Sequence, residues 1–470
     1  FQAEDGIRDR SPSRGLGDVY KRQVMPLKGA LSDGRTDAVL RIIVMLSSSL
    51  YAMIYFIKNI KPIALLMYVF SSVLIADDSF DIQFSDISIK TPAGSMSPHL
   101  STSKSNITIL NWLEPTDDGH RIQFSKFDSG WTEPSTVTNG NDWFINWADF
   151  PSVINFNQNE YAAHWLKKSG ESTYAYDAYI SISKNNGKSW SQPIKAHEDK
   201  TQTEHGFLSF YEHKNELGFI YLDGRKMANK ATHDKSHSSM SLRSGSIDRN
   251  LNLNNTQNID GLVCECCQTD ITVTDRGPIG VYRDRSEEEY RDIYITKLEN
   301  DSWTEGKPLH LDNWKINGCP VNGPVITGNS NEITVAWYTR SGGKSNIKIA
   351  KSFDYGETFN EPLLIGTNET VGHISMTTDN KRNTWLLWQK TAKKGLVELV
   401  LTKIEPDSNQ IMHKVIEEAG KSPRFSFPQI IRNGETIILA YTTVINDSRK
   451  TRGSNRKTSI KSLSFNANLY

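Results

Sequence analysis

The sequence predicts an all-β chain that folds as a β-propeller with seven blades. From Asp81 onward no segment has sustained helical periodicity, and short alternating strands are separated by Gly, Asn, Asp and Pro. The 31 Gly, 11 Trp, 17 Tyr and 18 Phe in 470 residues are typical of a β protein rich in turns. An apolar strand with a large aromatic residue also recurs at Trp112, Trp165, Tyr221, Tyr282, Trp337, Trp388 and Tyr441. Successive members are 51 to 61 residues apart, which indicates one repeated unit.

Each repeat has the same internal order. A first strand precedes the aromatic strand and is expected at residues 150–154, 207–211, 269–274, 324–326, 373–377 and 427–431. A third strand follows it and is expected at residues 121–126, 178–183, 239–244, 292–297, 346–351, 397–403 and 458–464. A weaker outer strand completes the unit. Four short strands in this order are expected to form one propeller blade.

The two ends of the repeat region complement each other. The last repeat ends at Tyr470 without an outer strand, whereas residues 80–89 form a strand without a repeat of their own. Pairing this N-terminal strand with the last blade would remove the open edges that a linear array leaves. A six-bladed ring with an extra hairpin is the alternative.

The first part of the chain has a different character. Residues 1–23 resemble a translated sequencing adapter, so we expect residues 1–52 to be upstream sequence that is not native. Residues 53–76 have a signal-peptide pattern, because Lys58 and Lys61 precede an apolar stretch that is too short to cross a bilayer. A retained anchor at residues 39–57 is the alternative. We expect cleavage, export to the periplasm or the cell exterior, no stable membrane insertion, and one domain over residues 77–470.

Two predicted turns between third and fourth strands carry a further pattern. Residues 352–359 read Ser-Phe-Asp-Tyr-Gly-Glu-Thr-Phe, and residues 183–190 repeat the spacing with Asn in place of Asp. The acidic or amide side chain accepts turn N–H groups and Gly takes a positive φ. This pattern resembles the Asp-box, or BNR repeat, of sialidase-like propellers. The segments Cys-Glu-Cys-Cys (264–267), Tyr-Arg-Asp-Arg (282–285) and Cys-Pro-Val-Asn-Gly-Pro (319–324) are similar to those of a bacterial exported group in that family.

The resemblance implies a small acidic sugar or glycan as partner and an activity like that of an exo-α-sialidase. Sialidases clamp a carboxylate with three arginines and use a tyrosine nucleophile, a glutamate and an acid/base aspartate. The residues that could clamp or bind the substrate are Arg225, Arg283, Arg285, Arg291, Arg340 and Asn322. The catalytic candidates are Tyr282, Asp284, Glu287 and Asp149. The Arg-Ile-Pro motif of sialidases is absent from the sequence.

The same charged residues have a simpler interpretation. Residues 283–292 could be a solvated loop with surface ion pairs, each of which contributes little. The chain has 54 basic and 54 acidic residues, so its net charge is zero and no nucleic-acid partner is expected. We expect a monomer.

The cysteines allow two interpretations. Cys264, Cys266, Cys267 and Cys319, with His205 or His373, could bind a soft ion such as Cu or Zn. Disulfides are the alternative in an exported protein, for example from Cys319 to one member of the other three. The sequence therefore leaves three function classes: a propeller that binds or hydrolyses an acidic glycan, a metal-binding or redox protein, and a non-catalytic propeller that binds a protein partner.

Overall fold

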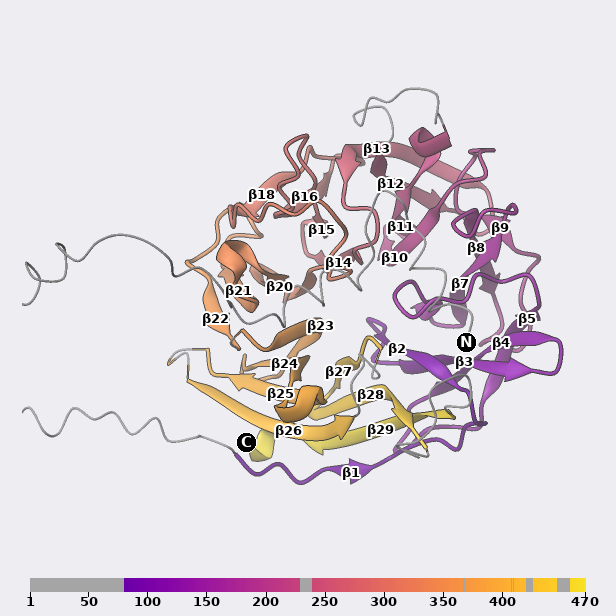
Figure 1. Cartoon of the computed structure of the whole chain (residues 1–470). Helices are drawn as coiled ribbons and strands as arrows, with labels where there is room; N and C mark the ends of the chain where they lie inside the picture. The colour runs from indigo at the N-terminus through magenta and orange to yellow at the C-terminus, as the bar shows by residue number, and fades with distance from the viewer. Residues whose placement is uncertain are drawn as a thin grey trace, which may run out of the picture. The chain divides into compact units, whose positions relative to one another are not determined.

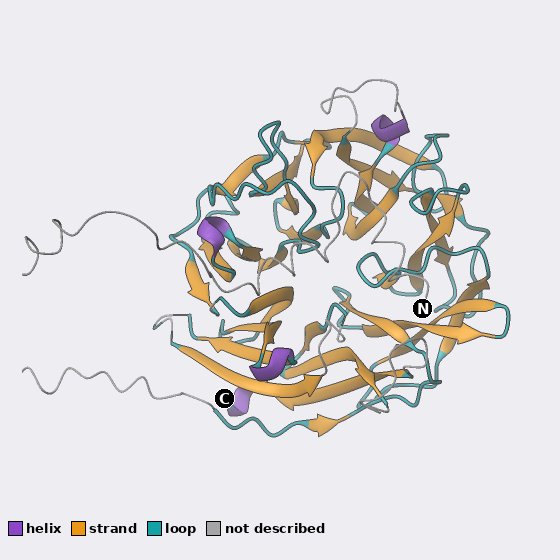
Figure 2. Ribbon diagram, in the orientation of Figure 1, coloured by secondary structure: helices purple, strands orange, loops and turns teal. Residues whose placement is uncertain are grey.

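The computed structural model describes residues 80–228, 239–366, 368–406, 408, 410–419, 426–445 and 457–470. The predicted upstream segment and signal peptide lie outside the described residues. Within the described part, seven antiparallel sheets follow one another around a ring (Figure 1), and nearly all regular structure is strand (Figure 2). The seven-bladed propeller is confirmed, and the six-bladed alternative is wrong.

The blades are consecutive in the chain. The strands of the first three blades are β2 (Met96–Thr102), β3 (Thr108–Thr116), β4 (Gly119–Lys126) and β5 (Ser135–Gly140); β6 (Ser152–Asn157), β7 (Glu160–Lys168), β8 (Tyr176–Ser183) and β9 (Ile194–Lys195); and β10 (His205–His213), β11 (Glu216–Asp223), β12 (Met240–Ile247) and β13 (Leu253–Val263). The fourth blade contains β14 (Asp270–Thr274), β15 (Gly277–Arg283), β16 (Ile293–Glu299), β17 (Ser302–Trp303) and β18 (Lys307–His310).

The remaining blades follow the same order. They are β19 (Val325–Asn329), β20 (Glu332–Thr339), β21 (Asn346–Ser352) and β22 (Leu363–Ile365); β23 (Thr370–Thr378), β24 (Thr384–Thr391), β25 (Val397–Ile404) and β26 (Ile411–Ala419); and β27 (Gln429–Asn433), β28 (Thr436–Val444) and β29 (Thr458–Asn466) with β1 (Ser85–Asp86). Short 3₁₀ turns occur at Arg225–Ala228, Ser341–Gly343, Lys393–Gly395 and Ala467–Leu469.

The hydrophobic core lies between neighbouring blades. The recurrent aromatic residues are on the second strand of each blade and are at most 4% exposed. Each buried cluster contains residues from adjacent blades; for example, Trp112 of β3 packs with Ile438 and Ala440 of β28. Successive side chains of a strand point to opposite faces of its blade, and each face packs against a neighbouring blade. A strand between two blades therefore needs apolar residues on both faces.

The ring closes as the sequence predicts. Ser85 and Asp86 of β1 pair with Ser464 and Leu463 of β29, so the N-terminal strand is the outer strand of the last blade. Figure 1 shows β1 along the outer edge of β29. The N–H of Ile87 extends this pairing by donating to the Ser462 carbonyl at 3.0 Å.

One face of the ring carries the candidate residues. The loops between second and third strands and the loops that lead into each next blade open there, and we call it the loop face. On this face Trp147 contacts His373 and Phe427, at ring-centroid distances of 5.3 and 5.8 Å, and thereby reaches across the axis from the second blade to the sixth and seventh. The innermost strands of all seven blades line a central channel of about 610 Å³ below this contact.

Candidate functional site

Three polar side chains of the loop face meet between the second and third blades. The Tyr176 hydroxyl donates to Oε1 of Glu204 at 2.9 Å and lies 3.3 Å from Oδ2 of Asp149. The same Asp149 oxygen accepts the N–H of Phe207 at 2.9 Å. All three side chains are buried. We call Asp149, Tyr176 and Glu204 the tyrosine–carboxylate set.

The protonation of this set follows from its burial. Burial raises the pKa of Asp149 to about 8, and the neighbouring Glu204 carboxylate adds to the rise against the opposing hydrogen bond from Phe207. Asp149 is therefore mostly protonated at neutral pH. A neutral acid and a carboxylate acceptor thus both lie within hydrogen-bond distance of one phenol hydroxyl, which suits proton donation and nucleophile activation.

Neighbouring groups shape the access to this set. The Phe144 ring stacks on Tyr176 with centroids 4.2 Å apart and planes at 9°. On another side, the N–H of Gly224 donates to the Glu204 carbonyl at 2.8 Å. The chain segment that carries Arg225 therefore passes directly beside Glu204.

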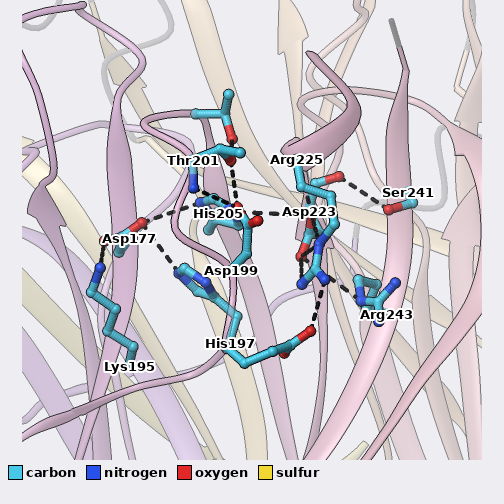
Figure 3. Close-up of polar contacts among 12 residues, drawn as sticks. Asp177, Lys195, His197, Asp199, Thr201, His205, Asp223, Arg225, Ser241 and Arg243 are labelled. Atoms are coloured by element: carbon cyan, nitrogen blue, oxygen red, sulfur yellow. Dashed lines mark hydrogen bonds and ion pairs between the residues drawn. The ribbon is translucent and has the colours of Figure 1, made fainter. Parts of the chain in front are cut away.

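A second polar group, shown in Figure 3, joins the same two blades. Oδ1 of Asp177 lies 3.2 Å from Nε2 of His197 and 3.2 Å from Nδ1 of His205. The other ring nitrogen of His205 lies 3.1 Å from Asp199 and 3.8 Å from Asp223. We call these five residues the histidine–aspartate cluster.

Charge decides the protonation of this cluster. Burial alone would lower the pKa of His205, but the close approach of the Asp177 carboxylate and the charges of Asp223 and Asp199 raise the pKa above its ordinary value. The pKa of Asp177 is held well below its usual range, because contacts with His197, His205 and Lys195 outweigh its burial. The protonated form of His205 is thus favoured by its surroundings.

The geometry of the histidine–aspartate cluster does not suit one metal ion. The candidate ligand atoms of Asp177, His197 and His205 lie within 4.8 Å of one another. However, the two imidazole rings stack with centroids 3.9 Å apart and planes at 11°. A metal ion lies in the plane of an imidazole that binds it, so two stacked rings cannot share an ion unless one turns. Both nitrogens of His205 face carboxylates rather than the cysteines.

The four cysteines come together from two loops, because Cys264, Cys266 and Cys267 lie in the loop that leads into the fourth blade and Cys319 lies in the loop that leads into the fifth. Cys266 and Cys319 form a disulfide, with Cα atoms 6.2 Å apart. Cys264 and Cys267 are buried free thiols whose sulfur atoms are 2.9 Å apart, and the Cys264 sulfur is 3.7 Å from that of Cys319. We call these four residues the cysteine cluster. The structure thus contains a disulfide from Cys319 to one of the other three cysteines, as one interpretation of the sequence predicts. A metal site with all four sulfurs would require reduction of this disulfide.

The two free thiols differ in acidity. Burial would raise the pKa of Cys264, but the hydrogen bond from Cys267 and the charge of Arg291 hold it at about 6. Burial and the same hydrogen bond raise the pKa of Cys267 above its ordinary value. One thiolate with a neutral thiol as its partner is therefore the favoured state of this pair.

An arginine–glutamate network holds the cysteine loop in place. Glu265, between Cys264 and Cys266 in the sequence, accepts a bond from Arg291 at 2.6 Å and a short bond from Arg285. The same two guanidinium groups bind Glu289 at 2.9 and 2.6 Å. We call Glu265, Arg285, Glu289 and Arg291 the arginine–glutamate network. It joins the loop before β14 to the loop between β15 and β16.

The other predicted arginines have different surroundings. Arg283 is 2% exposed and donates to the carbonyl groups of Asn322, Arg291 and Tyr338 at 2.7–3.0 Å. Arg225 binds Asp223 through several nitrogen atoms and Glu198 at 2.7 Å. The Arg340 side chain has no hydrogen-bond or ion-pair partner among the described residues. The five arginines therefore do not gather into one clamp: Arg225 lies beside Glu204, and Arg283, Arg285 and Arg291 lie beside the cysteines.

The predicted catalytic residues are also divided. Asp149 belongs to the tyrosine–carboxylate set, whereas Tyr282 is buried and donates to Oδ2 of Asp260 at 2.7 Å. Burial and the nearby Asp260 raise the pKa of Asp284 to about 7. Glu287 is exposed to solvent. The roles predicted for these residues remain predictions.

Asn322 and His373 support the backbone near the axis. The Asn322 side chain accepts the N–H of His373 at 2.8 Å and donates to the Val371 carbonyl at 3.3 Å, so it links the fifth and sixth blades. Burial lowers the pKa of His373 to about 4, so its ring is neutral. The ring lies against Trp147 and Phe427.

Sequence reasoning missed Tyr176, Glu204, Asp177 and His197. Tyr176 and Asp177 begin a third strand, where side-chain partners come from the next blade and are 28 and 20 residues away in the chain. Their position at a strand start on the loop face was the one available signal, and it is shared by many residues.

Comparisons with known proteins leave the family open. No family model and no curated protein matches the chain. Among solved structures, a Dyadobacter fermentans protein of unknown function is 12% identical, with 82% of this chain and 99% of that chain covered and a TM-score of 0.46. A Fusarium graminearum α-L-arabinofuranosidase is 11% identical, with 82% and 98% covered and a TM-score of 0.44. A phage phi92 endosialidase is 9% identical, with 82% and 69% covered and a TM-score of 0.46. Likenesses this distant assign no activity.

The described residues include no helix with the length and apolar character needed to span a membrane.

Proposed function

We propose that this chain is an exported propeller that binds an acidic glycan on its loop face and hydrolyses a glycosidic bond at the tyrosine–carboxylate set. The observation that carries the proposal is the hydrogen-bonded arrangement of Tyr176, Glu204 and Asp149. A tyrosine nucleophile with a carboxylate partner is one known solution for glycoside hydrolysis. No metal ion is needed for this chemistry.

Each member has a role that its surroundings support. Glu204 is placed to accept the hydroxyl proton of Tyr176, which makes the phenol oxygen a better nucleophile. Asp149 has a pKa of about 8 and so can donate a proton to the leaving oxygen at neutral pH. Phe144 covers the Tyr176 ring, so the segment that contains it must shift when a substrate enters.

Two arginines near this set favour an acidic sugar. Arg225 and Arg243 have side chains that are 22% and 17% exposed, and both approach Asp223. Arg243 makes no close bond, since its Nε is 3.9 Å from Asp223 and has no hydrogen-bond partner among the described residues. A guanidinium group with free donors matches a carboxylate well.

A panel of fluorogenic glycosides of acidic sugars tests the proposal. We expect hydrolysis of at least one member, and a loss of at least about 100-fold in kcat/KM for Tyr176→Phe and for Glu204→Gln. Tyr441→Phe is the matched control, because Tyr441 also donates to a glutamate, Glu417, at 2.8 Å but lies in the last blade. We expect this variant to retain full activity.

Calorimetry with the same sugars separates binding from catalysis. Binding without hydrolysis would reduce the proposal to a glycan-binding propeller, and Arg243→Ala should then weaken the affinity. If no acidic sugar is bound or cleaved, the proposal is wrong.

A further inference from the structure

The cysteine cluster contains two sulfur pairs at different depths. Cys264 and Cys267 are 1% and 2% exposed, whereas the disulfide partners Cys266 and Cys319 are partly exposed. The sulfur atoms of Cys264, Cys267 and Cys319 all lie within 4.8 Å of one another. A buried dithiol is therefore in direct contact with a disulfide that solvent can reach.

The surroundings of the buried pair favour a thiolate at Cys264. Arg291 is 2% exposed, and its Nε is buried with no hydrogen-bond partner among the described residues. Its charge acts on Cys264, and Arg283 adds a second buried cation to the same neighbourhood. A nearby guanidinium stabilises a thiolate, and the thiolate is the form that attacks a disulfide.

Backbone contacts hold the attacking sulfur in position. The N–H of Cys264 donates to the Arg283 carbonyl at 3.0 Å, and Val263 and Asp284 form a β-bridge beside it. The arginine–glutamate network fixes Glu265, the next residue. Cys264 is therefore held on both sides while its sulfur faces Cys267 and Cys319.

We propose that the cysteine cluster is a thiol–disulfide exchange site, in which the buried dithiol of Cys264 and Cys267 passes two electrons to the surface disulfide Cys266–Cys319. In the first step the Cys264 thiolate attacks the Cys319 sulfur, a Cys264–Cys319 bond forms and Cys266 leaves as a thiolate. In the second step the Cys267 thiolate attacks the Cys264 sulfur, and Cys319 leaves as a thiolate. The single proton of the buried pair, which begins on Cys267, passes to one of the two released sulfurs, and the other released sulfur carries the negative charge that began on Cys264.

This exchange gives the site an external partner of defined chemistry. The reduced surface pair can pass its electrons to a disulfide in solution, and a dithiol in solution can reverse the sequence. The protein would thus exchange redox equivalents with a small or protein-borne disulfide, independently of any glycan chemistry between the second and third blades.

A soft metal ion is the competing occupant of this cluster. It would need Cys266 and Cys319 as free thiolates, whereas they are joined in the structure. The histidines that could complete such a site are engaged elsewhere: His205 faces carboxylates, and His373 lies against aromatic rings.

Trapping the first step tests the proposal. The full chain is acid-quenched, alkylated in denaturant and mapped by peptide mass spectrometry. In Cys267→Ser the second step is blocked, so we expect a Cys264–Cys319 bond and alkylated Cys266. In the matched control Cys264→Ser the first step is blocked, so we expect the Cys266–Cys319 bond and alkylated Cys267. An intact Cys266–Cys319 bond with alkylated Cys264 in the Cys267→Ser chain would overturn the proposal.

A measurement on the unaltered chain covers the case in which a variant does not fold. The unaltered chain is incubated in thiol buffers of graded potential. Among the chains that have two free thiols, some should hold the Cys266–Cys319 disulfide and the others the Cys264–Cys267 disulfide. Detection of only one linkage at every potential would show that the pairs do not exchange. Four free cysteines together with a bound copper or zinc ion in the native mass would identify a metal site instead.

Discussion

At the scale of single residues, His205 is the clearest source of pH dependence. Its folded pKa is raised by carboxylates, so the protonated ring stabilises the fold. This contribution is complete below the unfolded pKa of roughly 6.5 and is lost as the pH rises through the raised folded pKa. We expect the free energy of unfolding of the wild type to fall over that window and the fall to be smaller in His205→Gln. Denaturant unfolding at a series of pH values measures it.

His164 provides a control of opposite sign. It is also buried, but burial lowers its pKa to about 3, and Ser152 is its hydrogen-bond partner at 2.7 Å. A neutral buried histidine reduces stability below the unfolded pKa and has no effect above it. His164→Gln should therefore change the pH slope only below about pH 6.5. If His205→Gln leaves the slope above that pH unchanged, the protonation assigned to His205 is wrong.

Glu265 is the residue on which the arginine–glutamate network depends. Burial would raise its pKa, but Arg291 and Arg285 outweigh this and keep the pKa below its ordinary value, so Glu265 is ionised. Glu265→Gln would leave two largely buried cations with one remaining carboxylate. We expect the free energy of unfolding to fall by about 3 kcal/mol in denaturant unfolding.

The exposed pair of Lys214 and Asp301 is the comparison for Glu265. Water screens this pair, so Asp301→Asn should leave the unfolding midpoint unchanged. Equal effects of the two substitutions would mean that the network near the cysteines behaves as an ordinary surface feature.

Residue types in the sequence indicated chemistry but not partners. Their shared charge predicted that Arg225, Arg283, Arg285, Arg291 and Arg340 could bind the substrate. In the structure, Arg283 binds carbonyl groups and Arg225 binds Asp223. Tyr176 and Tyr282 both donate to a carboxylate, but Glu204 is 28 residues from Tyr176 and Asp260 is 22 residues from Tyr282. Such partners depend on how adjacent blades align, which no local pattern contains.

At the scale of elements, the turns between third and fourth strands are the most predictable feature. In the turn after β21, Oδ1 of Asp354 accepts the N–H of Thr358 at 2.9 Å and of Glu357 at 3.1 Å, and Gly356 has φ +74°. In the turn after β8, Asn185 accepts the N–H of Ser189 at 2.9 Å. Local sequence sufficed here because every partner lies within four residues.

This equivalence predicts the outcome of two substitutions. Asp354→Asn should have little effect, since Asn185 makes the same contact in the other turn. Asp354→Ala removes the acceptor for two N–H groups and should lower the free energy of unfolding by about 1 to 2 kcal/mol. Chemical denaturation of both variants provides the measurement, and an equal loss in both would show that charge, not the hydrogen-bond acceptor, stabilises the turn.

At the scale of the whole molecule, the fold could be predicted because it repeats. One aromatic strand alone is weak evidence for any fold, but seven such strands at similar spacing exclude most other architectures. The missing outer strand and the spare N-terminal strand then determined how the ring closes. The functional groups do not repeat: the tyrosine–carboxylate set and the cysteine cluster each occur between one pair of blades, so periodicity gave no information about them.

Closure of the ring by β1 leads to the last prediction. A chain that begins at Lys90 lacks the pairing of Ser85 and Asp86 with β29. It also lacks the contacts of five apolar residues, Phe80, Ile82, Phe84, Ile87 and Ile89, of which only Ile82 is fully buried. Compared with a chain that begins at Ser79, its free energy of unfolding should be lower by about 5 kcal/mol, because burial contributes roughly 2 kcal/mol for Ile82 and about 1 kcal/mol or less for each partly buried side chain.

The shortened chain should also self-associate. Removal of β1 leaves the outer edge of β29 unpaired while its other edge still pairs with β28, and an open strand edge pairs with other chains. Size-exclusion chromatography at several concentrations would show this as a concentration-dependent shift to larger species. A shortened chain that stays monomeric and unfolds at the same denaturant concentration as the longer one would mean that the first six blades and the three remaining strands of the seventh hold the ring closed without the N-terminal strand.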